Sequence, residues 1–145
     1  MRKPAQVLIF QFYKEKNKYL YAVFKRRDLK FWQGISGGLE NDETPLKAAK
    51  RETFEETKIK PKSKFIRLDS KTSIPIENVG KHKWKKNIYV ATEFSFGVEV
   101  KTKEIKLSKE HTEMAWVTFN KAIKLLKYDS NKTALWELNR RLTKN

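Results

Sequence analysis

The sequence predicts an α/β fold in which a central mixed sheet is covered by helices on both faces. Three observations support this prediction. The length of 145 residues suits one domain. Segments rich in aromatic and β-branched residues alternate with segments of helical apolar spacing. Their order is two strands, a helix, two or three strands and two helices, without an internal repeat or low-complexity linker, so we expect a single domain over residues 1–145.

The first part of the chain is predicted to form a hairpin, a loop and a helix. Residues 5–13 and 19–26 are rich in strand-forming residues and flank a polar, turn-like segment. An irregular stretch with glycines then leads to residues 45–57. Pro45 can occupy the first helical position there, and Thr44 can cap the helix. We therefore expect a helix over 45–57.

The second part is predicted to complete the sheet and add two helices. Residues 64–76 and 87–100 have strand character and are separated by a basic loop, and residues 111–119 suggest a last strand. Helical apolar spacing follows over 120–128 and 130–142. Asn120 and Ser130 stand at the starts of these helices as plausible caps.

Composition restricts the class of partner. The 33 Lys and Arg residues against 17 Asp and Glu residues give a formal charge of +16, which favours polyanions such as nucleotides, nucleic acid or an acidic membrane surface. The chain has no cysteine, which excludes disulfides and thiolate metal sites. The N-terminal residues contain no apolar run long enough for a signal peptide or membrane helix, so we expect a cytoplasmic protein.

Acidic residues gather in one stretch of this basic chain: Glu40, Asp42, Glu43, Glu52, Glu55 and Glu56. On a helix, Glu52 shares a face with Glu55 and Glu56, and the three carboxylates repel one another. We therefore expect Glu56→Gln to leave the metal-free protein no less stable. A solvated acidic face is one interpretation. A divalent-metal site for Mg²⁺ or Mn²⁺ is the other, and it also explains Gly37 and Gly38, which let the backbone approach another group closely.

The spacing of these residues resembles a known signature. The pattern Gly-x5-Glu-x7-Arg-Glu-x-x-Glu-Glu is met by Gly37, Glu43, Arg51, Glu52, Glu55 and Glu56, and it is similar to that of the Nudix hydrolases. Two positions depart from the family pattern. Thr53 replaces the usual aliphatic residue, and Lys58 replaces a glycine that normally permits a left-handed helix exit.

The resemblance implies the Nudix fold, an α/β/α sandwich with a central mixed sheet, and a phosphoanhydride hydrolase that uses Mg²⁺ or Mn²⁺. It also implies roles for single residues. Glu52 and Glu56 would be metal ligands, and Glu55 would be a further ligand or the base that activates water. Arg51 would orient this cluster by pairing with Glu43. The carbonyl of Ser36 could complete the coordination.

Further similarity, over residues 26–40 and 108–138, points to the bacterial branch of dATP pyrophosphohydrolases and dihydroneopterin triphosphate pyrophosphatases. This branch implies cleavage of a nucleoside or pterin triphosphate to the monophosphate and pyrophosphate. It also implies a further metal-binding glutamate at Glu110, for which Glu113 competes. Another nucleoside diphosphate derivative as substrate, or a nucleic-acid-binding module on the same fold, stays open as an alternative, and the basic surface leaves RNA contact possible.

Substrate contacts are predicted around the glycines, and each has a structural alternative. Arg26, which ends a strand, could bind phosphate oxygens or serve solubility. Trp32 could stack on a base or pterin ring or pack in the core. Ser130 resembles a substrate-proximal serine or caps a helix. The remaining candidates are Arg2, Lys3, Ser36, Gly37 and Gly38.

Overall fold

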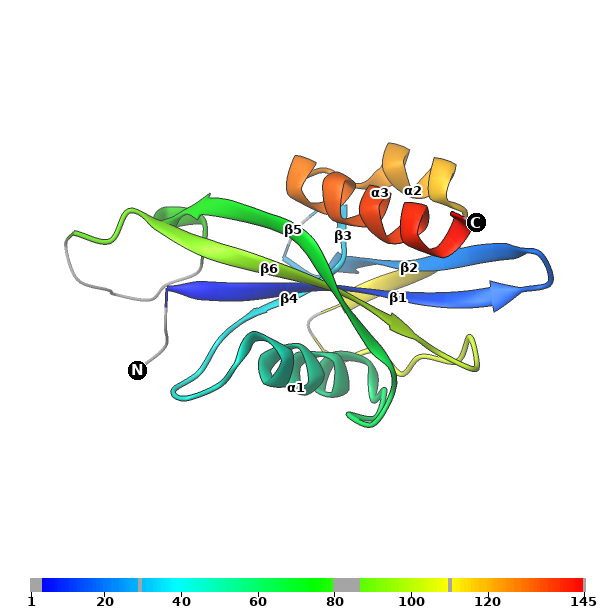
Figure 1. The fold of residues 1–145 in the computed structure, drawn as a ribbon, viewed down its shortest axis with the longest axis horizontal. Helices are drawn as coiled ribbons and strands as arrows, with labels where there is room; N and C mark the ends of the chain where they lie inside the picture. Colours follow the sequence, from blue (N-terminus) through cyan, green and yellow to red (C-terminus); the bar gives the residue numbers. More distant parts are fainter. Residues whose placement is uncertain (1–3, 29, 80–86, 110, 145) are drawn as a thin grey trace.

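A computed structural model describes residues 4–28, 30–79, 87–109 and 111–144. Within these residues a seven-stranded mixed sheet is accompanied by three α-helices and one short 3-10 helix (Figure 1). In chain order the elements are β1 (Ala5–Glu15), β2 (Lys18–Arg26), β3 (Trp32–Gln33), β4 (Ile35–Gly38), α1 (Pro45–Thr57), β5 (Phe65–Pro75), η1 (Ile76–Asn78), β6 (Val90–Glu99), β7 (His111–Val117), α2 (Phe119–Leu125) and α3 (Asp129–Thr143).

Strand β1 organises the sheet. It forms the expected antiparallel hairpin with β2, from the pair Phe12 and Tyr21 to the pair Glu15 and Lys18. Its other edge pairs in parallel with β6. The beginning of β1 pairs antiparallel with β4, which places the backbone of Gly37 beside Val7. The glycine loop is therefore fixed to the centre of the sheet.

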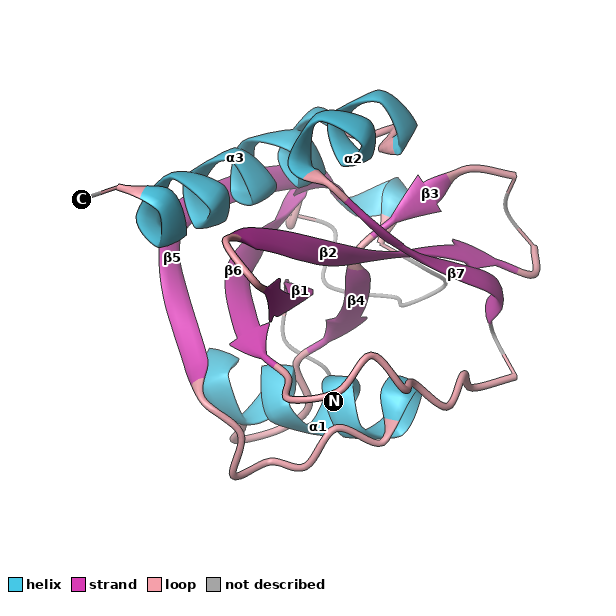
Figure 2. Ribbon diagram, turned by 90° about the vertical axis from the view of Figure 1, so that its right-hand side faces the viewer, coloured by secondary structure: helices cyan, strands magenta, loops and turns pink. Residues whose placement is uncertain are grey.

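Helices cover both faces of this sheet, as Figures 1 and 2 show: α1 lies on one face, and α2 and α3 lie on the other. The side chains of β1 alternate between the two sides. Val7 and Ile9 belong to the core cluster that includes Ala48 of α1, whereas Leu8 and Phe10 belong to the cluster that includes residues of α2 and α3. The α/β fold class predicted from the sequence is confirmed.

Helix α1 has the predicted boundaries. Pro45 occupies its first turn, and the Thr44 hydroxyl accepts a hydrogen bond from the Lys47 amide at 3.2 Å. Ala48 and Ala49 are fully buried against the sheet. The face with small residues thus fixes the helix on the sheet, and Glu52, Glu55 and Glu56 follow within the next two turns.

The exit of α1 explains how the chain manages without the family's glycine. Lys58 adopts the left-handed conformation itself, with φ 64° and ψ 16°, and its amide donates to the Phe54 carbonyl at 2.8 Å. A residue with a β-carbon pays roughly 1–2 kcal/mol for this conformation. The helix exit therefore keeps the left-handed geometry that a glycine normally permits. The strained conformation of Lys58 lowers the stability of the fold.

We therefore expect Lys58→Gly to stabilise the protein by about 1 kcal/mol, because glycine adopts positive φ without steric cost while losing somewhat more backbone entropy on folding. Thermal unfolding should show a melting temperature higher by roughly 2–4 °C. Lys58→Ala, which keeps the β-carbon, is the matched control. An equal gain in both variants would assign the effect to the lysine side chain instead.

The caps predicted for the last two helices are wrong. Helix α2 begins at Phe119, and the Thr118 hydroxyl accepts from the Lys121 amide at 3.4 Å, so Asn120 lies inside the helix. Helix α3 begins at Asp129 without a side-chain cap, and Ser130 lies in its first turn. Both helices start one or two residues earlier than the sequence pattern indicates. The Ser130 side chain instead interacts with Glu93, since its hydrogen bond is one of the two that lower the pKa of that carboxyl group.

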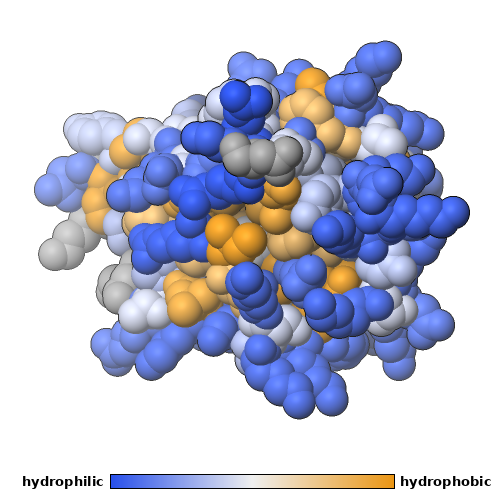
Figure 3. All heavy atoms as spheres, turned by 45° about the vertical axis from the view of Figure 1, so that its right-hand side comes forward, coloured by the Kyte–Doolittle hydropathy of each residue, from blue (hydrophilic) through white to orange (hydrophobic). Residues whose placement is uncertain are grey.

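Hydrophilic residues dominate the face shown in Figure 3, with smaller hydrophobic areas between them. Among the residues that the structure describes, the exposed large hydrophobic side chains are Leu46, Phe54, Tyr89, Val90, Tyr128 and Trp136. In the part of the chain that the structure describes, no helix is both long and apolar enough to cross a membrane.

Candidate active site

A cavity of about 490 Å³ opens between the two helical layers at the glycine loop. Helix α1 contributes Glu52, Glu55 and Glu56 to its lining, and Ser36, Gly37 and Gly38 come from β4. The rest of the lining consists of Gln6, which pairs with Gly38, and of Gln33, Glu93, Tyr128, Ser130 and Asn131, with Ile74, Pro75 and Val79 as an apolar wall. The cavity therefore joins an acidic end to a mixed polar and apolar end.

Arg51 connects the acidic helix to the loop in front of it. Its guanidinium binds Glu43 through two hydrogen bonds of 2.7 and 2.9 Å, and it donates to the Gly38 carbonyl at 2.8 Å. The same group donates to Glu52 at 2.9 Å and lies 3.4 Å from Glu55. The structure thus brings Arg51 and Glu43 together as the sequence predicts, in a bidentate geometry that fixes both partners.

Glycine at position 37 leaves room for the Glu52 carboxyl group. A β-carbon built there would lie 2.1 Å from the carboxyl carbon of Glu52 and 2.3 Å from its Oε1. The Glu52 side chain is only 13% exposed. Burial raises the pKa of Glu52 to about 7, with the neighbouring Glu55 and Glu56 adding to the rise and Arg51 opposing it. Glu52 is therefore a carboxylate held at a cost in a tight space beside the loop.

The shifted pKa of Glu52 predicts how stability depends on pH in the metal-free protein. Below about pH 4.5 Glu52 is protonated in both the folded and the unfolded state, so it carries no penalty. As the pH rises to about 7, the unfolded chain loses its proton first, and the free energy of unfolding falls. At 1.36 kcal/mol per pKa unit the full penalty is on the order of 3 kcal/mol.

Glu52→Gln should therefore be about as stable as the wild type near pH 4.5 and clearly more stable near pH 8. Urea unfolding of both proteins in chelator, at several pH values, measures this difference. A difference that does not change with pH would contradict the buried, strained state of Glu52.

Glu56 has a different environment. The Ser108 hydroxyl donates to its Oε2, and His111 Nδ1 lies 3.1 Å from the same oxygen. Burial alone would raise the pKa of Glu56, but these two partners, together with the charge of Arg26, lower it. Glu56 does repel Glu52, as expected, and it contributes to the raised pKa of Glu52. The partners of Glu56 nevertheless stabilise its own negative charge, so we now expect Glu56→Gln to lower the stability of the metal-free protein rather than to leave it unchanged.

Arg26 and Glu55 lie along the open part of the acidic end. Both line the cavity, and the Glu55 side chain is 51% exposed. Arg26 contacts Asp28 at 3.2 Å through one guanidinium nitrogen, while its buried Nε has no hydrogen-bond partner among the described residues. A cationic group with an unused donor at the mouth of an acidic cavity is suited to an anionic ligand.

The donor set fits a small divalent cation that is shared with a ligand. In the described part of the chain, no three His, Cys, Asp or Glu side chains are placed so that together they could hold a metal ion. Glu52 is turned to Arg51, and Glu56 is turned to Ser108 and His111. Mg²⁺ is commonly bound by one or two carboxylates and completed by water and substrate phosphates. The hard oxygens of α1 suit such an open site.

Several predicted site residues either lie outside the described residues or do not line the cavity. Arg2, Lys3 and Glu110 lie outside the described residues. Glu113, the competing candidate, is 3.8 Å from Lys25 and does not line the cavity. Trp32 packs against the core cluster beneath α2 and α3 and does not line the cavity either, so its prediction as a stacking residue is corrected to the packing alternative.

Six polar or aromatic residues outside the acidic stretch line the cavity without having been predicted from the sequence: Gln6, Gln33, Asn78, Glu93, Tyr128 and Asn131. Gln33, Glu93 and Asn131 are more than nine-tenths buried, Gln6 is half-buried, and Asn78 and Tyr128 are exposed. Only Glu93 had a usable signal. It stands between Ala91 and Ser95 on the inward positions of a strand, where a carboxylate is unexpected.

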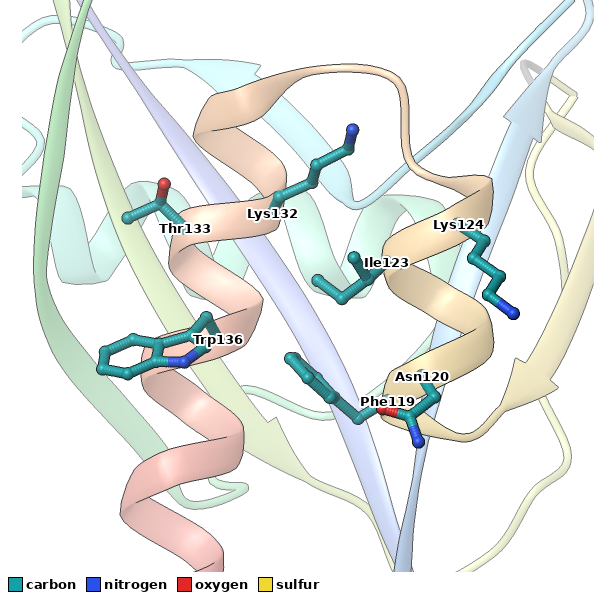
Figure 4. A pocket seen from close by; sticks show the side chains of 7 residues that line it. All are labelled: Phe119, Asn120, Ile123, Lys124, Lys132, Thr133 and Trp136. Atoms are coloured by element: carbon teal, nitrogen blue, oxygen red, sulfur yellow. The ribbon is translucent and has the colours of Figure 1, made fainter.

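Two further hollows differ in chemistry from this cavity. One, of about 670 Å³, lies between α2 and α3, where Figure 4 shows Phe119, Ile123 and Trp136 grouped with the lysines Lys124 and Lys132 around them. The other, of about 1000 Å³, adjoins the exit of α1 and is lined by seven lysines. Neither contains the motif carboxylates or the glycine loop.

A mixed sheet between helical layers, with an Arg-Glu-x-x-Glu-Glu helix placed against a glycine loop, is the arrangement of a Nudix hydrolase. The chain belongs to this family: the family model described as NUDIX domain matches residues 2–138. The resemblance and the enzyme class inferred from the sequence are confirmed.

Similar proteins agree with this assignment. The dihydroneopterin triphosphate diphosphatase of Haemophilus influenzae is 33% identical over 132 residues, which cover 89% of this chain and 83% of that protein. The Escherichia coli K12 protein of the same name is 26% identical and covers 92% and 91%. Among solved structures, a chain from Listeria monocytogenes described as a NUDIX hydrolase has a TM-score of 0.87 at 39% identity, covering 97% and 94%. The E. coli dihydroneopterin triphosphate pyrophosphohydrolase has a TM-score of 0.81 at 24% identity, covering 97% of each chain, which shows the shared fold.

Proposed function

We propose that the protein is a Mg²⁺-dependent pyrophosphohydrolase that cleaves dihydroneopterin triphosphate or a (deoxy)nucleoside triphosphate to the monophosphate and pyrophosphate. The observation that carries this proposal is the single cavity that joins the α1 carboxylates to a polar and aromatic pocket. A triphosphate fits the first end and a ring fits the second. The names of the H. influenzae and E. coli relatives support the pterin compound.

Within this proposal, Glu52 and Glu56 hold the divalent cation, with Glu55 and the Ser36 carbonyl as further ligands. Glu110, which lies outside the described residues, is kept as a proposed ligand. The cation would neutralise charge that develops on phosphate oxygens and would make bound water more acidic. Mg²⁺ is the proposed ion, and Mn²⁺ accepts the same hard oxygen ligands.

The chain's own groups then bind and orient the substrate. Arg26 binds phosphate oxygens at the mouth of the cavity, with Arg2 and Lys3 as further proposed contacts. Gly37 and Gly38 let the phosphates approach the backbone, and Ser130 lies at the ring end. Arg51, through its hydrogen bonds to Glu43 and to the Gly38 carbonyl, holds the helix against the glycine loop. Glu55, the most exposed carboxylate of the helix, accepts the proton of the attacking water at its carboxylate oxygen.

The match over residues 2–138 supports a further proposal, that residues 1–145 form a single Nudix domain. A screen tests the function directly. The purified protein with Mg²⁺ is incubated with dihydroneopterin triphosphate, nucleoside triphosphates, dinucleoside polyphosphates and nucleotide sugars, and pyrophosphate and orthophosphate are measured separately. We expect pyrophosphate from a triphosphate. Preferred cleavage of a dinucleotide or a nucleotide sugar would overturn the proposed substrate class.

Contact with RNA is a second candidate because of the lysine-lined groove. Lys58, Lys60, Lys62, Lys64 and Lys106 have no carboxylate partner in the described residues, whereas Lys101 and Lys103 are paired. Phosphate-driven binding weakens steeply with salt. A single-stranded RNA oligonucleotide should therefore bind at low salt and lose affinity in a Lys60, Lys62 and Lys64 triple alanine variant. Equal affinity of the wild type and this variant would exclude the groove.

A further inference from the structure

One carboxylate of the cavity lies apart from helix α1. Glu93, on β6, is only 3% exposed and lines the ring end of the cavity. Gln6 Nε2 donates to its Oε2 at 2.5 Å. Among the described residues no lysine or arginine forms a salt bridge with Glu93, in a chain that has 33 such residues. Burying a carboxylate without a cationic partner lowers the stability of the folded protein.

The loss of stability can be traced to the second carboxylate oxygen of Glu93, Oε1. Oε1 is buried, and it has no hydrogen bond of ordinary geometry within the described part of the chain. Burial raises the pKa of Glu93, and Gln6 and Ser130 only partly oppose that rise. A buried acceptor without a donor costs roughly 1–3 kcal/mol. Since this acceptor lines a cavity, a ligand with N–H donors can satisfy it.

We propose that Glu93 binds the adjacent ring N–H and amino group of a 2-amino-4-oxo pyrimidine ring, the edge that pterins and guanine share. This inference rests on the proposed function, because it specifies the ring whose triphosphate is cleaved. A carboxylate accepts two parallel N–H bonds, as it does from arginine. Oε1 has no hydrogen bond of ordinary geometry among the described residues, so a ligand N–H would meet only the weaker interaction with Ser130 there. Oε2 has a second acceptor site beside the bond from Gln6. Adenine and cytosine present a ring acceptor beside their amino group, which would face the carboxylate unfavourably.

The surroundings of Glu93 are built to hold a flat ring. Tyr128 lines the same cavity, and its ring is braced edge-on by Phe31 at 5.1 Å between centroids. Asn131 is 4% exposed, and its Oδ1 accepts from the Gly34 amide at 2.8 Å. These contacts hold Tyr128 and Asn131 in place beside Glu93. From this end, the attached triphosphate extends toward Arg26 and the α1 carboxylates.

Glu93→Gln tests the proposal, because it keeps the size of the side chain and replaces one acceptor oxygen with a donor. Neopterin, which has the ring and no phosphate, is the probe for ring binding in the absence of metal. Hydrolysis of GTP and ITP, which differ by the amino group alone, gives the second readout. We expect neopterin affinity, and the ratio of kcat/KM for GTP over ITP, each to fall at least about tenfold.

Glu99→Gln is the matched control, since it makes the same change on the same strand outside the cavity. Its neopterin affinity and GTP to ITP ratio should equal those of the wild type. Wild-type values in Glu93→Gln would overturn the assignment of Glu93. If Glu93→Gln lacks a cooperative thermal transition, Glu93→Asp takes its place: it keeps the charge but withdraws the carboxylate, so the same losses are expected, and unchanged values again overturn the proposal.

The two readouts separate this inference from the function on which it rests. Neopterin binding that depends on Glu93, in a wild-type protein that releases no pyrophosphate from any triphosphate, would contradict the proposed function and leave the ring site in place. If the wild type releases pyrophosphate but binds neopterin independently of Glu93, the ring site is contradicted and the proposed function stands.

Discussion

Glu56→Gln is expected to lower kcat by roughly 10³-fold or more at saturating Mg²⁺, about 4 kcal/mol at 1.36 kcal/mol per decade. The substitution keeps the size of the side chain and removes the charge of a proposed metal ligand. The metal-free variant should also unfold at a somewhat lower temperature, because Ser108 and His111 favour the ionised carboxylate that is lost.

Steady-state kinetics and melting curves on the same preparation measure both effects. Glu113→Gln, an exposed glutamate of β7 outside the cavity, is the control and should retain wild-type turnover. An acidic residue that served stability alone would show a lowered melting temperature with nearly normal turnover. More than about a tenth of wild-type kcat in Glu56→Gln would refute the assignment.

Gly37→Ala should reduce kcat roughly 10²-fold while the protein stays folded. The added β-carbon would overlap the Glu52 carboxyl group, and this group is the end of a flexible side chain that can move away. The displacement is on the scale of an ångström, which is enough to cost about two orders of magnitude at a catalytic centre. Circular dichroism and kinetics on the same sample separate folding from activity.

Gly97→Ala is the matched comparison for this substitution. Its β-carbon would meet Leu138 in the core at 2.5 Å, away from the carboxylates. It should lower the melting temperature while the folded fraction keeps its turnover. If Gly37→Ala instead lost stability and kept its turnover, the close approach of Gly37 and Glu52 would have only a structural role.

Local signals made the fold and the acidic end of the site predictable. The hairpin and helix α1 follow from alternation, the Thr44 cap and Pro45, which act within a few residues. The Arg51 and Glu43 pair follows from motif spacing. The sequence shows that Lys58 replaces the family's glycine, but only the structure shows that Lys58 itself adopts the left-handed conformation there.

The ring end of the site could not be predicted in the same way, because it is assembled by tertiary contacts. Gln6 and Glu93 meet only through the parallel pairing of β1 with β6. Asn131 lines the cavity from the first turn of α3, beside Ser130, and only for Ser130 did the family resemblance imply a place near the substrate. Trp32 shows the converse, since closeness to the glycine loop in sequence did not bring its ring to the cavity.

Binding of a divalent cation by the α1 carboxylates is the central claim, and Mn²⁺ titration followed by electron paramagnetic resonance tests it most directly. After exhaustive chelation, the wild-type protein should have no turnover, should bind Mn²⁺ saturably and should recover turnover as the site fills. Glu56→Gln should lose this site, and Glu113→Gln should keep it. Full turnover of the chelated wild type, or the same Mn²⁺ binding in Glu56→Gln as in the wild type, would contradict the account.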